Sequence, residues 1–178
     1  TFGFQTEHEG ANALAPIITE DPAGVHGSSL LLRSQGGQPA RIQTKAFDPG
    51  ADCILVEADV MFASLNFNMA ERSYLDTKVE PGGVWVKTVN VSSSGSLTVP
   101  GIAGDAKPFT IQQGKWYKFR HIFDNKNSTL TFMVDDNVLC HNEKMVTEFE
   151  YLNYGLFTAS YNSSANINYL YIDNQAEN

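Results

Sequence analysis

The chain has 178 residues, and its 12 Lys and Arg against 20 Asp and Glu give a formal net charge of −8. This length suits a single domain with a sizeable core, and 42% hydrophobic residues exclude a disordered chain. The acidic balance argues against a nucleic-acid partner, which needs clustered Lys and Arg, and no stretch approaches the roughly 18 apolar residues of a membrane span. The start at Thr1 is that of a processed or excised domain, so we expect a secreted or cell-surface piece of a larger modular protein.

Hydrophobic residues recur with a period of two along almost the whole chain, which is the spacing of strands. The expected strands are residues 29–33, 40–44, 53–62, 74–79, 83–91, 96–99, 115–124, 129–134, 138–140, 154–161 and 167–172. Gly and Pro between them fit tight turns, and a short helical turn is expected near residues 142–147. Residues 1–178 therefore predict one all-β domain, a sandwich, jelly roll or barrel.

Two of these segments carry more detail. The longest apolar strand, residues 53–62, has apolar neighbours on both faces and is expected in the centre of a sheet. Residues 115–124 and 129–134 flank a polar turn and predict a hairpin. Alternation along the first of them places Tyr117, Phe119, His121 and Phe123 on one face. The two cysteines, Cys53 and Cys140, make no disulfide framework and are expected to be free, buried thiols.

The hairpin also carries a resemblance. Its pattern G-K-W-Y at residues 114–117, then Asp124 and T-x-T-F-x-V-D at residues 129–135, resembles the concanavalin A-like lectin/glucanase and laminin-G-like jelly rolls. Residues 4–7 with 27–32 are similar to the first strands of carbohydrate-binding modules, and residues 171–174 to their last strand. The resemblance implies an antiparallel β-sandwich jelly roll and places Trp116 at a position that usually packs inside. Because such a fold hosts many activities, function has to be argued from sites.

Many such jelly rolls hold a structural calcium where the first and last strands meet. By position, the resemblance implies Asp173 together with Glu7 or Glu9 as ligands. Calcium takes several hard oxygen ligands in flexible geometry, which carboxylates and strand-end carbonyls supply. The other interpretation is that Asp173 and its neighbour only cap an exposed strand end.

Glycosidases of this fold carry E-x-D-x-x-E on one strand, because an acid and a nucleophile must flank one glycosidic bond. Here Glu57 and Asp59 match the first two positions and share one strand face, but Phe62 replaces the third carboxylate. Two charged residues on a polar strand face are the favoured interpretation. We therefore do not expect a hydrolase.

Polysaccharide lyases of the same class neutralise a uronate carboxylate and use His or Tyr to remove the adjacent proton. Similarity to the alginate-lyase-like pattern implies Arg72, His121 and Tyr161 as the catalytic set. The chain departs from that pattern at Tyr74, where the family has Glu, at Thr158, where it has Lys, and before His121, where it has Gln. A hydrogen-bonded residue beside the aromatic face is the preferred interpretation of His121.

A sugar-binding module needs aromatic side chains that pack on pyranose rings and polar groups that bond hydroxyls. Trp85, Tyr74 and Arg72 are the expected binding residues, since polar, loop-like stretches bracket them. The sequence thus predicts non-catalytic, lectin-like polysaccharide binding. A lyase that cuts a uronate-containing glycan and a laminin-G-like adhesion domain that binds a protein remain the alternatives.

Overall fold

A computed structural model describes residues 5–7, 15–34, 40–65, 73–159 and 168–177. The described residues form strands joined by turns, and they include no helix, so none of them builds a helix that could span a bilayer. The strands are β1 (Gln5–Glu7), β2 (Ile17–Glu20), β3 (Ser28–Ser34), β4 (Ala40–Gln43), β5 (Cys53–Phe62), β6 (Ser73–Glu80), β7 (Val84–Val91), β8 (Ser96–Thr98), β9 (Phe109–Thr110), β10 (Trp116–Asp124), β11 (Thr129–Val134), β12 (Asn137–Lys144), β13 (Tyr151–Ala159) and β14 (Asn168–Glu177).

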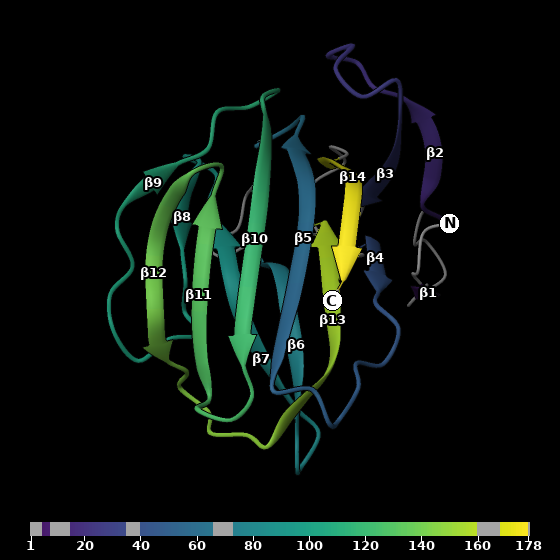
Figure 1. The fold of residues 1–178 in the computed structure, drawn as a ribbon. Coiled ribbons are helices and arrows are strands. Elements are labelled where there is room, and N and C mark those ends of the chain that lie inside the picture. The colour runs from purple at the N-terminus through teal and green to yellow at the C-terminus, as the bar shows by residue number, and fades with distance from the viewer. Residues whose placement is uncertain (1–4, 8–14, 35–39, 66–72, 160–167, 178) are drawn as a thin grey trace.

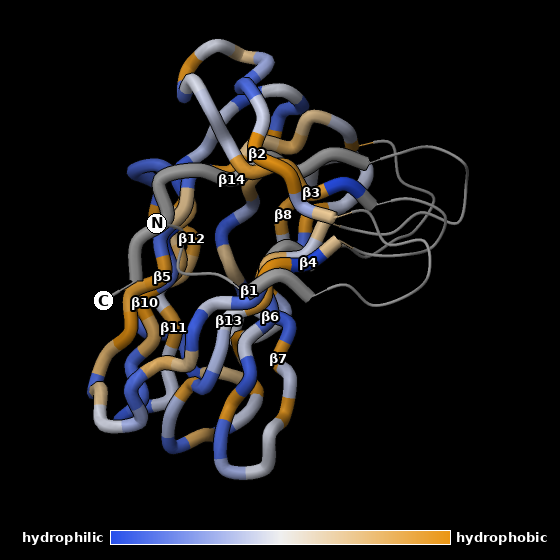
Figure 2. The backbone as a smooth tube through the Cα atoms, turned by 90° about the vertical axis from the view of Figure 1, so that its right-hand side faces the viewer, coloured by the Kyte–Doolittle hydropathy of each residue, from blue (hydrophilic) through white to orange (hydrophobic). Residues whose placement is uncertain are grey.

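These strands build two antiparallel sheets that pack face to face. Sheet A has the order β1-β4-β13-β6-β7-β8-β9, and sheet B has the order β12-β11-β10-β5-β14-β3-β2. Sheet B lies in front in Figure 1, and the side view in Figure 2 shows β5, β10 and β11 in one layer and β13, β6 and β7 in the other. The predicted all-β jelly-roll sandwich is confirmed.

Alternation along the strands sets the core between the sheets. In β10 every second residue is buried, and Tyr117, Phe119, His121 and Phe123 all face inward as the sequence predicts. The β10–β11 hairpin is present, and β5 pairs with β10 on one side and β14 on the other. The residues of β5 from 58 to 62 are buried on both faces, which confirms its central position.

One long connection covers an edge of sheet B. The segment between β8 and β9 runs beside edge strand β12, where Ala103 N–H donates to the Lys144 carbonyl (2.7 Å) and Lys107 N–H to the Leu139 carbonyl (2.8 Å). Ile102 also forms a bridge with Met145. Covering an edge in this way satisfies its backbone groups and blocks pairing with another chain.

This contact explains where the sequence interpretation is wrong. A helical turn was expected at residues 142–147, but β12 continues to Lys144 and Met145 bonds across to the covering segment. Backbone N–H and C=O groups that already bond in an extended pairing are not available for the hydrogen bonds of a helical turn. β13 begins three residues before the expected strand at 154–161, and β14 continues five residues beyond the end of the expected strand at 167–172.

Candidate functional site

A row of side chains with two aromatic members crosses three strands on the outer face of sheet A. In the register of the sheet, Lys78 of β6 pairs with Trp85 of β7 on one side and with Tyr154 of β13 on the other. Paired residues of antiparallel strands point to the same face. Trp85 is 45% exposed, and the Lys78 ammonium lies 5.7 Å from the centre of the Tyr154 ring. We call Trp85, Lys78 and Tyr154 the platform row.

A carboxylate holds the middle residue of this row in place. Glu80 lies two residues after Lys78 on the same strand face, with Oε1 3.8 Å from the Lys78 Nζ. The same oxygen accepts a hydrogen bond from Asn153 Nδ2 (3.2 Å), and Oε2 accepts one from the Gly83 N–H (3.0 Å). Glu80 thus ties β6 both to β13 and to the turn that leads into Trp85.

The outer face of sheet A continues beyond the platform row with polar residues. The next pairs along the strands are Asp76 with Lys87, then Arg41 with Thr158 and Asn90 with Thr98. Asn90 Oδ1 and Thr158 Oγ1 are buried and make no hydrogen bond with any residue that the structure describes. Buried oxygens of this kind usually bond water or a ligand, so this part of the face is suited to hydroxyl groups.

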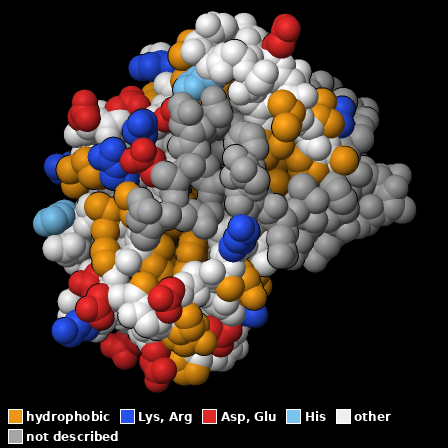
Figure 3. Space-filling view, turned by 45° about the vertical axis from the view of Figure 1, so that its right-hand side comes forward, with side chains coloured by type: hydrophobic (Ala, Val, Ile, Leu, Met, Phe, Trp, Pro, Cys, Tyr) orange, Lys and Arg blue, Asp and Glu red, His pale blue; other side chains and the backbone are white. Residues whose placement is uncertain are grey.

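The outer face of sheet B is instead occupied by its own ion pairs. Glu57 accepts a hydrogen bond from Arg120 Nε (2.7 Å) and lies 3.5 Å from Lys118 Nζ. The Arg120 hydrogen bond, more than the opposing effect of burial, holds the pKa of Glu57 below its ordinary value. Glu57 and Asp59 do share a face, as predicted, but an ionised and paired Glu57 is unsuited to donate a proton. Basic and acidic side chains lie interleaved at the left of Figure 3, where sheet B faces the viewer.

Trp116 also lies on the outer face of sheet B, which corrects the expectation that it packs inside. Its indole N–H donates to Asp21 Oδ2 (3.0 Å), and its ring lies 4.3 Å from the ring of His26. Burial would raise the pKa of Asp21, but N–H groups of residues 23, 25 and 26 and of Trp116 hold it below its ordinary value. Trp116 is thus covered by the β2–β3 loop, and the half-exposed tryptophan of the molecule is Trp85.

His121 lies in the core, on the inner face of sheet B. It is 1% exposed and stacks on Phe132, with ring centroids 4.5 Å apart. Burial lowers the pKa of His121 to about 3, and a hydrogen bond with the Val56 backbone opposes that shift only in part. The side chain is therefore neutral and enclosed by aromatic rings, which agrees with the preferred interpretation of a packing residue.

The other predicted site residues are only partly within the described structure. Arg72 and Tyr161 lie outside the described residues. Tyr74 lies on β6 beside Leu75, at an irregularity in the pairing with β7. Glu7 pairs with Arg41 in sheet A, whereas Asp173 pairs with Asp59 in sheet B.

The expected calcium ligands are therefore carried by strands of opposite sheets. β1 pairs with β4, and β14 pairs with β3 and β5, so the first and last strands are not neighbours in one sheet. Among the residues that the structure describes, no three His, Cys, Asp or Glu side chains come together around one point. A calcium held by Asp173 with Glu7 or Glu9 therefore stays a prediction.

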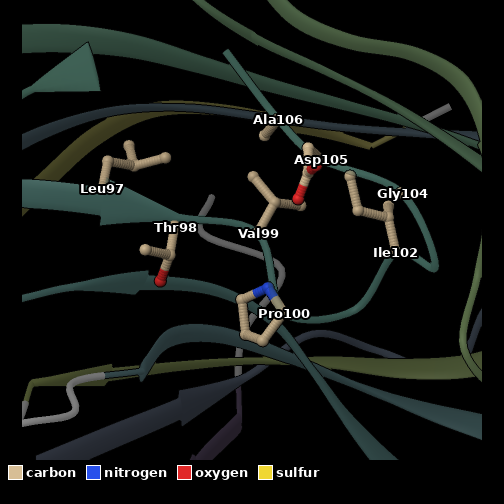
Figure 4. Close-up of a pocket in the computed structure, with 8 residues that line it drawn as sticks. All are labelled: Leu97, Thr98, Val99, Pro100, Ile102, Gly104, Asp105 and Ala106. Atoms are coloured by element: carbon tan, nitrogen blue, oxygen red, sulfur yellow. The ribbon is translucent and has the colours of Figure 1, made fainter. Parts of the chain in front are cut away.

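A pocket of about 290 Å³ lies beside β8 and the segment that follows it. It is lined by Leu97, Thr98, Val99, Pro100, Ile102, Gly104, Asp105 and Ala106 (Figure 4). Thr98 pairs with Asn90, five residues along β7 from Trp85, which is about 17 Å at the rise of a strand. The pocket is thus separate from the platform row.

Sequence reasoning selected Trp85 and missed its partners. No motif in the sequence singles out Tyr154, Lys78 or Glu80. The spacing of two residues between Lys78 and Glu80 on a predicted strand does place them on one face. Their position between Trp85 and Tyr154, however, depends on the order and register of three strands.

Comparisons with known proteins agree with the fold. No protein-family model and no curated protein matches the sequence. Among solved structures, the chain is similar to a "Sialidase" (TM-score 0.68, 10% identity), covering 99% of this chain and 17% of that one. It is similar to "Cellulose induced protein, Cip1" (TM-score 0.65, 8% identity, 98% of this chain and 90% of that one).

A third similar structure is the "Alginate lyase AlgAT5 from Polysaccharide Lyase family 7". Its TM-score is 0.62 at 8% identity, over 96% of this chain and 84% of that one. The chain thus spans about a sixth of the sialidase and most of the other two. At such identities the likeness establishes the fold and no activity. The chain has a jelly-roll fold that is structurally similar to that of concanavalin A-like proteins.

Proposed function

We propose that the chain is a secreted, non-catalytic module that binds a polysaccharide on the outer face of sheet A. The observation that carries the proposal is the platform row, in which Trp85 is 45% exposed and lies in register with Lys78 and Tyr154. Large exposed aromatic side chains are uncommon on a solvated strand and pack well on the apolar faces of pyranose rings. Polar side chains on the same face supply hydrogen bonds to hydroxyl groups.

Two further observations favour binding over cleavage. Glu57, the first carboxylate of the incomplete glycosidase pattern, is held by Arg120 and Lys118. His121, the histidine of the lyase alternative, is enclosed in the core between the sheets. An ionised, paired Glu57 is unsuited to donate a proton, and the enclosed His121 cannot reach one on a ligand outside the core. The names of the similar structures, which include a sialidase and an alginate lyase, support a glycan as the ligand class.

Affinity electrophoresis through gels with dissolved polysaccharides tests the proposal. We expect at least one polymer to retard the wild-type chain and to keep its length, as measured by viscosity. Trp85→Ala should abolish most of the retardation. Loss of a central aromatic anchor weakens binding by about 2 kcal/mol, or about 30-fold in affinity. Trp85→Phe should keep part of it, because a smaller ring still stacks.

Val146→Ala is the control, since Val146 is 57% exposed and lies outside sheet A. Unchanged retardation in Trp85→Ala would remove the platform row from the binding site. Unsaturated, ultraviolet-absorbing ends would establish the lyase alternative. No retardation by any polymer would contradict glycan binding and favour the laminin-G-like adhesion domain.

A further inference from the structure

The platform row holds a charge pair beside its aromatic groups, and this pair bears on the kind of glycan that fits. Lys78 Nζ and Glu80 Oε1 are 3.8 Å apart, and their side chains are 29% and 20% exposed. The ammonium offers hydrogen-bond donors and the carboxylate offers acceptors, side by side and both reachable from solvent. The complement of such a pair is a group that both donates and accepts at two adjacent positions.

A vicinal diol of a sugar ring is that complement. Each hydroxyl group donates one hydrogen bond and accepts others, so one can accept from Lys78 while its neighbour donates to Glu80. The Glu80 carboxylate is already fixed by Asn153 and by the Gly83 N–H, so it is ordered before any ligand arrives. Preorganised polar groups bind a ligand with little loss of conformational entropy.

The position of Lys78 between the aromatic rings, with Glu80 beside it, places this diol within the ligand. Trp85 and Tyr154 lie on strands two apart in sheet A, with β6 between them, which is about 9.6 Å at the usual strand spacing. That separation is close to a disaccharide repeat of an extended glycan. Rings stacked on Trp85 and on Tyr154 would therefore flank one intervening ring, and that ring lies over Lys78 and Glu80.

A uronate fits the same place poorly. A carboxylate on the intervening ring would meet Lys78, but it would also lie beside Glu80, and like charges at such distance repel. The chain as a whole carries a formal net charge of −8, which disfavours the approach of a polyanion. We infer that the platform row selects a neutral glycan whose intervening ring presents a vicinal diol to Lys78 and Glu80. This inference rests on the proposed function.

Matched pairs of polymers test the inference, because they share a backbone and differ in carboxylate groups. The probes are hydroxyethylcellulose with carboxymethylcellulose, methyl-esterified polygalacturonate with polygalacturonate, and mannan with polymannuronate, each in affinity gels. We expect the neutral member of at least one pair to retard the chain more than its acidic partner. Lys78→Met should then lower the affinity for that neutral polymer about tenfold or more, the effect of losing a hydrogen bond to a charged donor.

Lys126→Met is the matched control, since it removes the same charge from an exposed turn of the β10–β11 hairpin. It should leave retardation unchanged. Stronger retardation by the acidic member would overturn the inference and leave glycan binding intact. Neutral binding that Lys78→Met does not weaken would overturn the role of the Lys78–Glu80 pair. No retardation by any of the six polymers would overturn the proposed function, and the inference with it.

Discussion

His121 makes the stability of the molecule depend on pH at the scale of a single side chain. Burial lowers its folded-state pKa to about 3, while an unfolded histidine titrates near 6.5. The unfolded chain therefore takes up the proton first as pH falls. Stability from the neutral imidazole is complete above about pH 6.5 and is lost between pH 6.5 and 3, by about 1.4 kcal/mol per pH unit.

We expect the free energy of unfolding to be about 2 kcal/mol lower at pH 5 than at pH 7 through this group alone. Urea denaturation of the wild type and of His121→Leu at both pH values measures it. His121→Leu should be less stable than the wild type at pH 7, but its free energy of unfolding should not fall by this amount between pH 7 and pH 5. Three carboxyl groups have lowered pKa values, those of Glu57, Asp21 and Asp124. Their protonation weakens the fold only below about pH 4, which is outside the range from pH 5 to pH 7. His141→Gln, which changes an exposed histidine, should keep the wild-type dependence of the unfolding free energy on pH. The same dependence in His121→Leu would contradict its assignment to His121.

Single residues also show how far sequence reasoning reaches. Trp85 is recognisable because a tryptophan beside a glycine-rich turn has little core to enter. Trp116 was expected inside, yet the alternation that buries Tyr117 turns its neighbour Trp116 outward. Strand alternation was the better guide of the two. Tyr154 joins Trp85 only through the register of β13, β6 and β7, which the sequence of any one strand does not contain.

At the scale of elements, strands with a clear alternating or apolar pattern were predictable, and short exposed strands were not. β5, β10 and β11 combine several alternating or apolar residues, so their limits follow from the pattern to within a residue. β2 and β9 have four and two residues, and their exposed positions give no alternation to detect. These short strands exist because neighbouring strands offer unpaired backbone groups to them.

The turn between β7 and β8 is an element whose glycine can be tested. Gly95 has a φ of 79°, its N–H donates to the Ser92 carbonyl, and its carbonyl accepts from Ile111 N–H. A Cβ at Gly95 would overlap the Ile111 carbonyl oxygen, in addition to the strain of a positive φ. We expect Gly95→Ala to destabilise the fold by about 3 kcal/mol in thermal or urea unfolding.

Gly114 provides the comparison for that prediction. Its φ of 75° is almost the same, but no atom lies within 4 Å of a Cβ built there. Gly114→Ala should therefore cost only the backbone strain, about 1 kcal/mol. Equal losses in the two variants would mean that the β7–β8 turn moves away from Ile111 without cost, and that the packing of β9 against it adds nothing.

At the scale of the whole molecule, the two cysteines report whether the sandwich opens as one unit. Cys53 on β5 is exposed and Cys140 on β12 is buried, and both are free. β10 and β11 lie between their strands, so the two residues are separated by at least about 14 Å, beyond the reach of a disulfide. The expectation of free thiols is confirmed, whereas burial holds for Cys140 alone. Burial also raises the pKa of the Cys140 thiol and slows its reaction further.

We expect a thiol reagent to modify one cysteine in the native chain and two in denaturant, and Cys53→Ser to leave no reactive native thiol. Cys140 lies on edge strand β12, which the segment between β8 and β9 covers through the Ala103 and Lys107 hydrogen bonds. If that cover holds, Cys140 should react with the same denaturant dependence as global unfolding. Rapid reaction of Cys140 in the absence of denaturant would show instead that the edge of sheet B opens by itself, and that the two sheets do not unfold together.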